Sequence, residues 1–227
     1  MLDKKNFYID GKWVSPEEQR IFKVIDPSNE EVCAEISLGG KKDIDKAVSS
    51  AKKAFKSWAY SSKEERLDLL ERLYVIYKKR WAEMAKLITL EMGAPMKFST
   101  EMQAATGASH IKSFKNILKD FKFERDLGEE KNNQKLLYEP KGVCALITPW
   151  NWPINQVNLK VIPALASACT VILKPSEIAP LSSMLLAEMI DEVKFPAGVF
   201  NLVNGDGAVT GDALTSHPDI DMISFTG

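Results

Sequence analysis

The sequence lacks the features that mark secreted, membrane-spanning and nucleic-acid-binding proteins. Residues 1–13 contain no apolar signal-peptide core and no small-residue cleavage site, and no later apolar run approaches the roughly 20 residues that a spanning helix needs. The net charge is −1 at pH 7, so no global field attracts nucleic acid or anionic lipid. We therefore expect a cytoplasmic protein with no nucleic-acid partner and no membrane partner.

Cysteine is scarce and its positions suit neither a disulfide framework nor a zinc site. Cys33, Cys144 and Cys169 are odd in number, widely spaced and outside any CxxC or CxxH pattern. We expect three reduced, mostly buried thiols and no metal site.

The composition is that of an ordinary soluble globular protein. The chain has 227 residues, of which 45% are hydrophobic and 27% are charged. This length allows one large domain or two small ones with a sizeable core. There is no low-complexity segment and no repeat beyond the alternation of strands and helices.

The stretch from Tyr138 to Glu177 predicts a β-α-β unit. Two apolar runs, 143–148 and 170–173, flank a segment of helical spacing at 154–168, which is long enough for a right-handed parallel crossover. Ligands of such units bind outside the carboxyl ends of the strands. Those ends carry Pro149-Trp150-Asn151 and Lys174-Pro175-Ser176-Glu177, so we expect these polar residues to converge on one crevice.

The remaining chain alternates predicted strands and helices. Residues 7–14 alternate around Asp10-Gly11, a dipeptide suited to a tight hairpin turn. Helical spacing covers 43–58, 97–121 and 180–193. A further helical run begins at the Ser62 capping box and ends at Gly93, and a break is expected near Arg80. Further strands are expected at 135–139, 199–203 and 221–225, a loop or hairpin tip at 124–134, and a short helix ending at His217.

TPWNWP, the lysine at Lys160 and KPSE occur in an order and spacing that resemble the NAD(P)-dependent aldehyde dehydrogenase superfamily. The resemblance continues through PAGVFNLVNGDG to SFTG and covers essentially the whole chain. It implies an α/β fold with a Rossmann-like parallel sheet and flanking helices, preceded by helices and a small β ribbon over residues 1–20. It also implies that roughly residues 122–140 form an arm used in homo-oligomer contacts, whereas the sequence alone indicates only an edge strand there.

Two residues are candidates for catalysis of aldehyde oxidation. The amide of Asn151 can hold a developing oxyanion, and the family uses the matching Asn in that way; the alternative is an Asn that caps the following helix. Lys160 interrupts an apolar helix, so it either extends to the surface or occupies a site that lowers its pKa. The resemblance implies that Lys160 takes part in a proton relay.

Lys174 and Glu177 are candidates to bracket the hydroxyls of an adenine ribose, next to Pro149, Trp150 and Ser176. The lysine would donate a hydrogen bond to the ribose and the carboxylate would accept one. The negative charge of the carboxylate would disfavour the extra phosphate of NADP, so NAD is the expected cofactor. The alternative is a Lys and a Glu on an ordinary exposed turn.

Two places compete for the pyrophosphate. Gly205-x-Gly207-x-x-x-Gly211 follows a strand and opens a helix, but its spacing departs from GxGxxG by one residue. The resemblance instead places the pyrophosphate at the turn that begins within Phe225-Thr226-Gly227. We expect Gly207 and Gly211 to pack closely near the adenine.

The resemblance implies that the general-base Glu and the nucleophilic Cys follow Gly227, and none of the three cysteines has the nucleophile motif. We therefore expect the N-terminal portion of a longer enzyme, an incomplete NAD-binding domain without its catalytic domain and with an exposed sheet edge. The expected activity is NAD-dependent oxidation of an unspecified small aldehyde in the completed enzyme, with the isolated chain inactive. The alternatives are a non-catalytic NAD-binding module and a piece that joins a homologue in a mixed oligomer.

Overall fold

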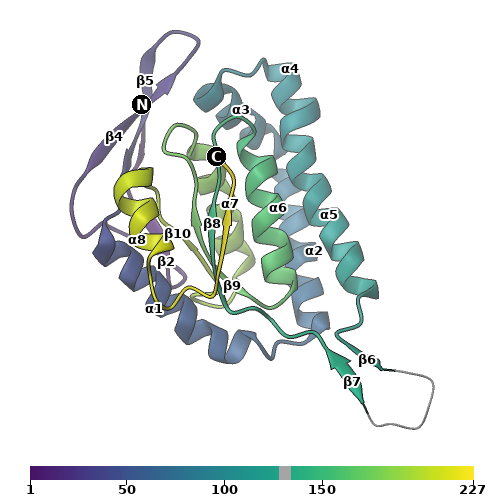
Figure 1. Ribbon diagram of the computed structural model, residues 1–227. Helices are drawn as coiled ribbons and strands as arrows, with labels where there is room; N and C mark the ends of the chain where they lie inside the picture. The colour runs from purple at the N-terminus through teal and green to yellow at the C-terminus, as the bar shows by residue number, and fades with distance from the viewer. Residues whose placement is uncertain (128–133) are drawn as a thin grey trace.

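A six-stranded sheet with the strand order β11-β8-β9-β10-β2-β3 lies at the centre of the fold (Figure 1). The computed structural model describes residues 1–127 and 134–227. The strands are β1 Leu2–Lys4, β2 Phe7–Ile9, β3 Lys12–Val14, β4 Ile21–Asp26, β5 Glu31–Ser37, β6 Glu124–Asp126, β7 Lys135–Leu137, β8 Val143–Ile147, β9 Thr170–Lys174, β10 Phe200–Leu202 and β11 Met222–Phe225.

Helices cover both faces of this sheet. They are α1 Lys41–Trp58, α2 Lys63–Lys79, α3 Trp81–Met92, α4 Met96–Phe98, the π-helix η1 Ser99–Gln103, α5 Ala104–Asp120, α6 Pro153–Ala166, α7 Leu181–Val193, the π-helix η2 Gly207–Gly211 and α8 Asp212–Thr215. In Figure 1, α1 and α8 lie on one side of the sheet, and α6 and α7 lie on the other with α2 and α5.

The central strands confirm the predicted parallel β-α-β unit. β8 pairs in parallel with β9 and with β11, and β9 pairs in parallel with β10. Successive side chains of a strand point to opposite faces. Accordingly Cys144 and Leu146 join the core on the α6 side, whereas Val143 and Ala145 join the core against α1. All residues of β8 and β9 are buried, as expected for parallel strands covered on both faces.

The N-terminal hairpin forms as predicted but does not stand apart as a ribbon over residues 1–20. Asp10 and Gly11 have φ angles of 53° and 71°, which suit the tight turn between β2 and β3. β2 then pairs antiparallel with β10 and so extends the central sheet.

A separate three-stranded sheet, β1-β5-β4, was not predicted over residues 21–37. Its strands carry charged residues and are only partly buried, and a register shift between Val24 and Ile25 breaks the alternation that would have revealed β4.

The helical predictions are confirmed with local differences. The Ser62 hydroxyl accepts a hydrogen bond from the Glu65 amide at 3.0 Å and begins α2. The long helical run breaks at Arg80, between α2 and α3, and ends at Gly93 with a φ angle of 73°. The third helical segment begins with α4 and η1 before α5.

β6 and β7 pair antiparallel into a hairpin that projects from the body of the fold (Figure 1). Thus β6 occupies part of the predicted loop 124–134, and the strand expected at 135–139 ends at Leu137. Residues 128–133, which belong to the predicted loop and arm, lie outside the described residues. Across the described chain, no helix combines the length and apolar character needed to cross a membrane.

Candidate cofactor and oxyanion site

The carboxyl ends of four parallel strands meet at one end of the sheet. Ile147 of β8 is in register with Lys174 of β9 and with Phe225 of β11, and Leu173 is in register with Leu202 of β10. The turns that follow these strands are therefore neighbours, as the β-α-β prediction implied, while the shared crevice stays a prediction. Phe225, Thr226 and Gly227 follow β11 at this end, and the Thr226 amide donates to the Ile147 carbonyl at 3.1 Å.

The turn between β8 and α6 presents Asn151 to solvent. Pro149 is half-buried, whereas Trp150 and Asn151 are exposed. The N-cap position of α6 belongs to Trp152, and its side chain makes no capping hydrogen bond. The alternative interpretation of Asn151 as the cap of this helix is therefore wrong, and its amide is free of that role.

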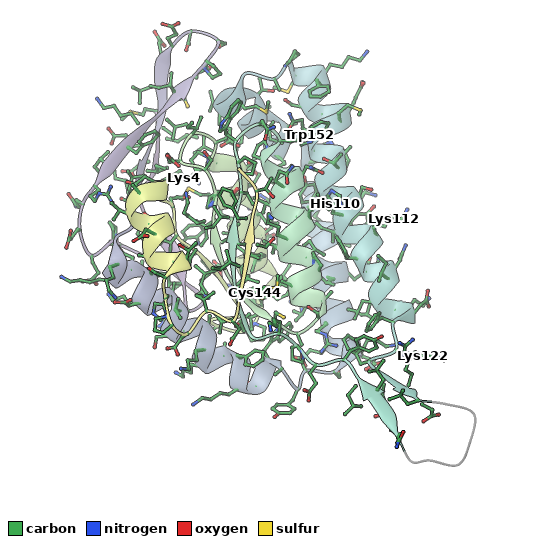
Figure 2. The ribbon with its side chains drawn as sticks, viewed as in Figure 1. Lys4, His110, Lys112, Lys122, Cys144 and Trp152 are labelled. Carbon is green, nitrogen blue, oxygen red and sulfur yellow. The ribbon has the colours of Figure 1, made fainter. Side chains whose placement is uncertain are left out.

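Trp152 contacts α4 and α5, and Figure 2 shows where it and His110 lie. Its indole N–H donates to the Thr106 hydroxyl at 3.2 Å, and its ring lies 5.8 Å from that of Phe98. One turn further along α6, Asn155 forms a 2.7 Å hydrogen bond with His110. These contacts between α5 and α6 were not predicted, because nothing in the local sequence pairs residues 45 positions apart.

Lys160 lies nine residues beyond Asn151, which is about 13 Å along an α-helix. Its ammonium donates to the Ser224 hydroxyl of β11 at 2.7 Å, and partial burial lowers the pKa of Lys160. Of the two alternatives, the structure favours a lysine in a shielded site. Lys160 thus connects α6 to β11. The Asn151 turn lies just before the N-terminus of the same helix.

Lys174 and Glu177 lie together where β9 ends. The Lys174 ammonium is buried, lies 3.7 Å from the Glu177 carboxylate and donates to the carbonyls of Pro175 and Gly205. Burial lowers the pKa of Lys174, while the charges of Glu177 and Asp206 oppose this shift. Ser176 is buried too, and its hydroxyl accepts from the Ile178 amide at 3.3 Å. A buried lysine is unlike the ordinary exposed turn that was the alternative.

The turn from Gly205 to Gly211 packs against Lys174. A Cβ at Gly205 would lie 1.8 Å from the Thr210 hydroxyl, and one at Gly211 would lie 3.8 Å from Cε of Lys174. The tight position is therefore Gly205, whereas the distances at Gly211 are ordinary van der Waals contacts. The close packing predicted for Gly207 is also not seen, because no atom lies within 4 Å of its Cβ position and its backbone faces open space. Lack of a side chain at Gly207 leaves room outside the turn.

Arg20, from the N-terminal part of the chain, also holds the turn from Gly205 to Gly211. The Arg20 guanidinium donates to the Asp206 carboxylate and, at 3.4 Å, to the Gly39 carbonyl. Asp206 in turn accepts from the Val209 amide at 2.7 Å, and Thr210 donates to Gly39. Burial raises the pKa of Asp206, but hydrogen bonds from Val209 and Arg20 outweigh it and lower the pKa.

None of the three cysteines is joined in a disulfide; Cys144 and Cys169 are buried while Cys33 is half-buried. Burial raises the pKa of Cys33, which opposes a nucleophilic role. The described residues hold no group of three or more metal-ligating side chains.

Residues 13–227 match the model of the aldehyde dehydrogenase family. The chain belongs to the aldehyde dehydrogenase family. It is 49% identical over its full length to 3-succinoylsemialdehyde-pyridine dehydrogenase from a Pseudomonas species, of which it spans 47%. It is 40% identical to a putative aldehyde dehydrogenase of Staphylococcus aureus, also spanning 47% of that protein.

Crystal structures of family members have the same fold. An aldehyde dehydrogenase of Bartonella henselae matches the whole chain with a TM-score of 0.97 and 56% identity, and the chain covers 48% of it. A mutant aldehyde dehydrogenase C from Pseudomonas syringae, complexed with NAD+ and octanal, matches 96% of the chain with a TM-score of 0.93 and 43% identity, over 44% of its own length. The chain therefore spans about half the length of these aldehyde dehydrogenases.

Proposed function

We propose that this chain supplies the cofactor-binding and oxyanion-binding residues of an NAD-dependent aldehyde dehydrogenase that oxidises a small aldehyde to a carboxylic acid. The observation that carries the proposal is the meeting of the Asn151, Lys174–Glu177 and Phe225–Gly227 turns at the carboxyl ends of neighbouring parallel strands. Family membership and the NAD+ complex of the Pseudomonas syringae relative support the same chemistry.

Lys174 and Glu177 would hold the adenine ribose, with Ser176 in the same turn. The Lys174 ammonium is a donor and the half-exposed Glu177 carboxylate an acceptor for adjacent hydroxyls, so the residues present fit the group. The negative charge of Glu177 favours NAD over NADP by repelling the additional phosphate. Gly207, with open space in front of its backbone, leaves room for an adenosine beside the turn.

Pro149, Trp150, Phe225, Thr226 and Gly227 would line the rest of the cofactor cleft. When bound, the nicotinamide would accept a hydride from the aldehyde carbon. Because the turn after β11 lies next to the turn after β8, a cofactor seated on these turns would bring this chemistry close to Asn151.

Asn151 would stabilise charge that develops on the aldehyde oxygen, since its amide is exposed and free of a helix-capping role. Lys160, with a pKa lowered by burial and a hydrogen bond to Ser224, would serve a proton relay. The general base and nucleophile would come from outside this chain, in a cytoplasmic homo-oligomer whose subunits contact one another through residues 122–140.

Calorimetry with NAD tests the cofactor assignment. We expect saturable binding to the pure chain and roughly tenfold weaker binding to Glu177→Gln, because a charge-assisted hydrogen bond is worth about 1.5–3 kcal/mol. Lys174→Ala should weaken binding as well, and Glu177→Gln should narrow the preference for NAD over NADP. Glu192→Gln, an exposed carboxylate change on α7, is the matched control. A folded chain that does not bind NAD would contradict the assignment.

The isolated chain should produce no NADH from NAD and an aldehyde, because the proposal places the nucleophile and general base elsewhere. The measurement is absorbance of NADH with the pure protein and a panel of aldehydes. NAD binding without turnover would agree both with an incomplete enzyme and with a non-catalytic NAD-binding module. Turnover restored by a separately produced C-terminal half of a family member would favour the enzyme, and measurable turnover by the chain alone would refute the proposal.

A further inference from the structure

A cavity of about 300 Å³ lies beside β8, β11 and α6, and two thiols line it. Figure 2 shows Cys144, the second residue of β8. The lining includes Cys144, Cys169, Ser167, Lys141, Lys160 and Met222. No step of the proposed dehydrogenase reaction uses either thiol.

The sheet register turns the two thiols toward the same side. Cys144 is the register partner of Val171, and Cys169 precedes Val171 by two residues. Because alternate side chains along a strand share a face, the Cys144 and Cys169 side chains point to the same side of the sheet. Both belong to the hydrophobic cluster beneath α6.

The backbone at Cys169 is firmly held. Its amide donates to the Ala164 carbonyl at 2.9 Å, and its carbonyl accepts from the Trp58 indole at 3.1 Å. The preceding residue, Ala168, has a φ angle of 62°, which closes the turn between α6 and β9. The backbone of Cys169 is therefore fixed beside β8.

Polar groups lie near the Cys169 sulfur. The Ser167 hydroxyl lies 3.6 Å from it, although the Pro163 and Ala164 carbonyls are closer acceptors for the hydroxyl proton, at 2.8 and 3.1 Å. The neighbouring Cys144 thiol lowers the pKa of Cys169 to about 6, while burial opposes the shift. The interaction with Cys169 and burial both raise the pKa of Cys144. A polar group and a lysine at a cavity wall favour the reactive thiolate form of a cysteine.

We propose that Cys144 and Cys169 are an oxidation-sensitive thiol pair, which hydrogen peroxide converts into an intramolecular disulfide. The Cys169 thiolate attacks one peroxide oxygen, the O–O bond breaks, and Cys169 becomes a sulfenic acid as hydroxide leaves. The Cys144 sulfur then attacks the Cys169 sulfur, the S–O bond breaks, and the departing oxygen takes the Cys144 proton as water. Two thiols lose two electrons, and the peroxide is reduced to two waters once the hydroxide is protonated.

The disulfide would link β8 to the turn before β9, the two strands whose other ends carry Asn151 and Lys174. A covalent link between these neighbours restricts the unfolded chain, so the oxidised protein should melt at a higher temperature than the reduced protein. Oxidation of this pair thus acts on the sheet and leaves the cofactor turns chemically unchanged.

Mass spectrometry of the 227-residue protein tests the pair. The reduced chain is treated with stoichiometric hydrogen peroxide, unfolded and alkylated. We expect an intact monomer that has lost two hydrogens, alkylated only at Cys33, with a peptide that links Cys144 to Cys169. Cys33→Ser is the matched control and should form the same link.

Two variants separate the roles of the thiols. Cys144→Val should leave Cys169 as a sulfenic acid that dimedone traps, whereas Cys169→Ala should leave Cys144 alkylatable; Cys144→Ser replaces Cys144→Val if the valine is poorly folded. The proposal is overturned if both thiols of the wild-type chain stay alkylatable, if Cys169 is oxidised without bonding to Cys144, or if the disulfides formed join Cys33 or two chains.

Discussion

Glu91, the penultimate residue of α3, is a fully buried carboxyl group that joins two helices. It accepts hydrogen bonds from the amides of Leu181 and Ser182 at the N-terminus of α7, the second at 3.2 Å. Burial raises the pKa of Glu91 to about 7, and the bonds from Ser182 and Leu181 only partly oppose this shift. The carboxyl group therefore binds a proton more tightly in the folded than in the unfolded chain.

This linkage makes stability depend on pH. A raised folded pKa contributes stability that is fully present below the unfolded value of 4.5 and is lost as the pH rises through about 7. We expect Glu91 to lower the free energy of unfolding by up to about 3 kcal/mol between pH 4.5 and pH 8. Urea unfolding at several pH values measures this change.

Substitution isolates the contribution of Glu91. Glu91→Gln should flatten the pH dependence, because the amide does not titrate, although its absolute stability can differ. Glu83→Gln, on the same helix but paired with Arg80 near the surface, is the control and should keep the wild-type slope. If the free energy of unfolding changed with pH equally in the wild type and in Glu91→Gln, the pKa of Glu91 would not be raised in the folded chain.

At the scale of elements, the turn between β10 and η2 depends on a strand far away in sequence. Arg20, just before β4, bonds to Asp206, and the Gly39 amide after β5 donates to the Asn204 carbonyl at 2.8 Å. Asp206 then caps η2, and Gly205 accepts from Lys174. The three-stranded sheet thus helps to position the proposed ribose-binding lysine without touching the ligand.

We predict that Arg20→Gln and Asp206→Asn each weaken NAD binding about three- to tenfold, with little change in melting temperature. Asp206→Asn keeps a side-chain oxygen that can cap η2, so the double variant should bind no more weakly than either single variant, because both substitutions remove the Arg20–Asp206 pair. Calorimetry measures the affinities, and Arg125→Gln, a distant exposed arginine on β6, is the control. If the wild type binds NAD and the two variants bind equally well, the positioning role is refuted; if the wild type does not bind, the cofactor assignment itself fails.

At the scale of the whole molecule, β11 forms one edge of the central sheet and exposes apolar side chains. Met222, Ile223 and Phe225 are 40%, 44% and 66% exposed. An exposed apolar edge strand is a template for pairing with another chain. The predicted exposed edge is therefore confirmed, and it is the surface at which association between chains should begin.

A charge on this edge should reduce association. We expect Ile223→Lys to lower the concentration-dependent light scattering of the pure protein, while the free energy of unfolding changes by only about 0.5 kcal/mol, as is usual for surface changes. Tyr60→Lys replaces an exposed aromatic residue away from the sheet edge and should leave the scattering unchanged. Scattering that responds equally to both substitutions would point to general surface hydrophobicity instead of the β11 edge.

The sequence by itself determined the central architecture. The apolar runs of β8 and β9, with helical spacing between them, require a parallel crossover, and such a crossover fixes the end of the sheet at which Asn151, Lys174 and Glu177 lie. The hairpin at Asp10-Gly11, the cap at Ser62 and the break at Arg80 were predictable because local backbone chemistry decides them.

Only the tertiary structure decided which distant residues meet. Arg20 with Asp206, His110 with Asn155, and Cys144 with Cys169 are brought together by sheet order and helix packing, for which local spacing carries no signal. The strands of residues 21–37 were not predicted for a related reason. They are only partly buried and are interrupted by a bulge, so their hydrophobic pattern is irregular and their pairing defines them as strands.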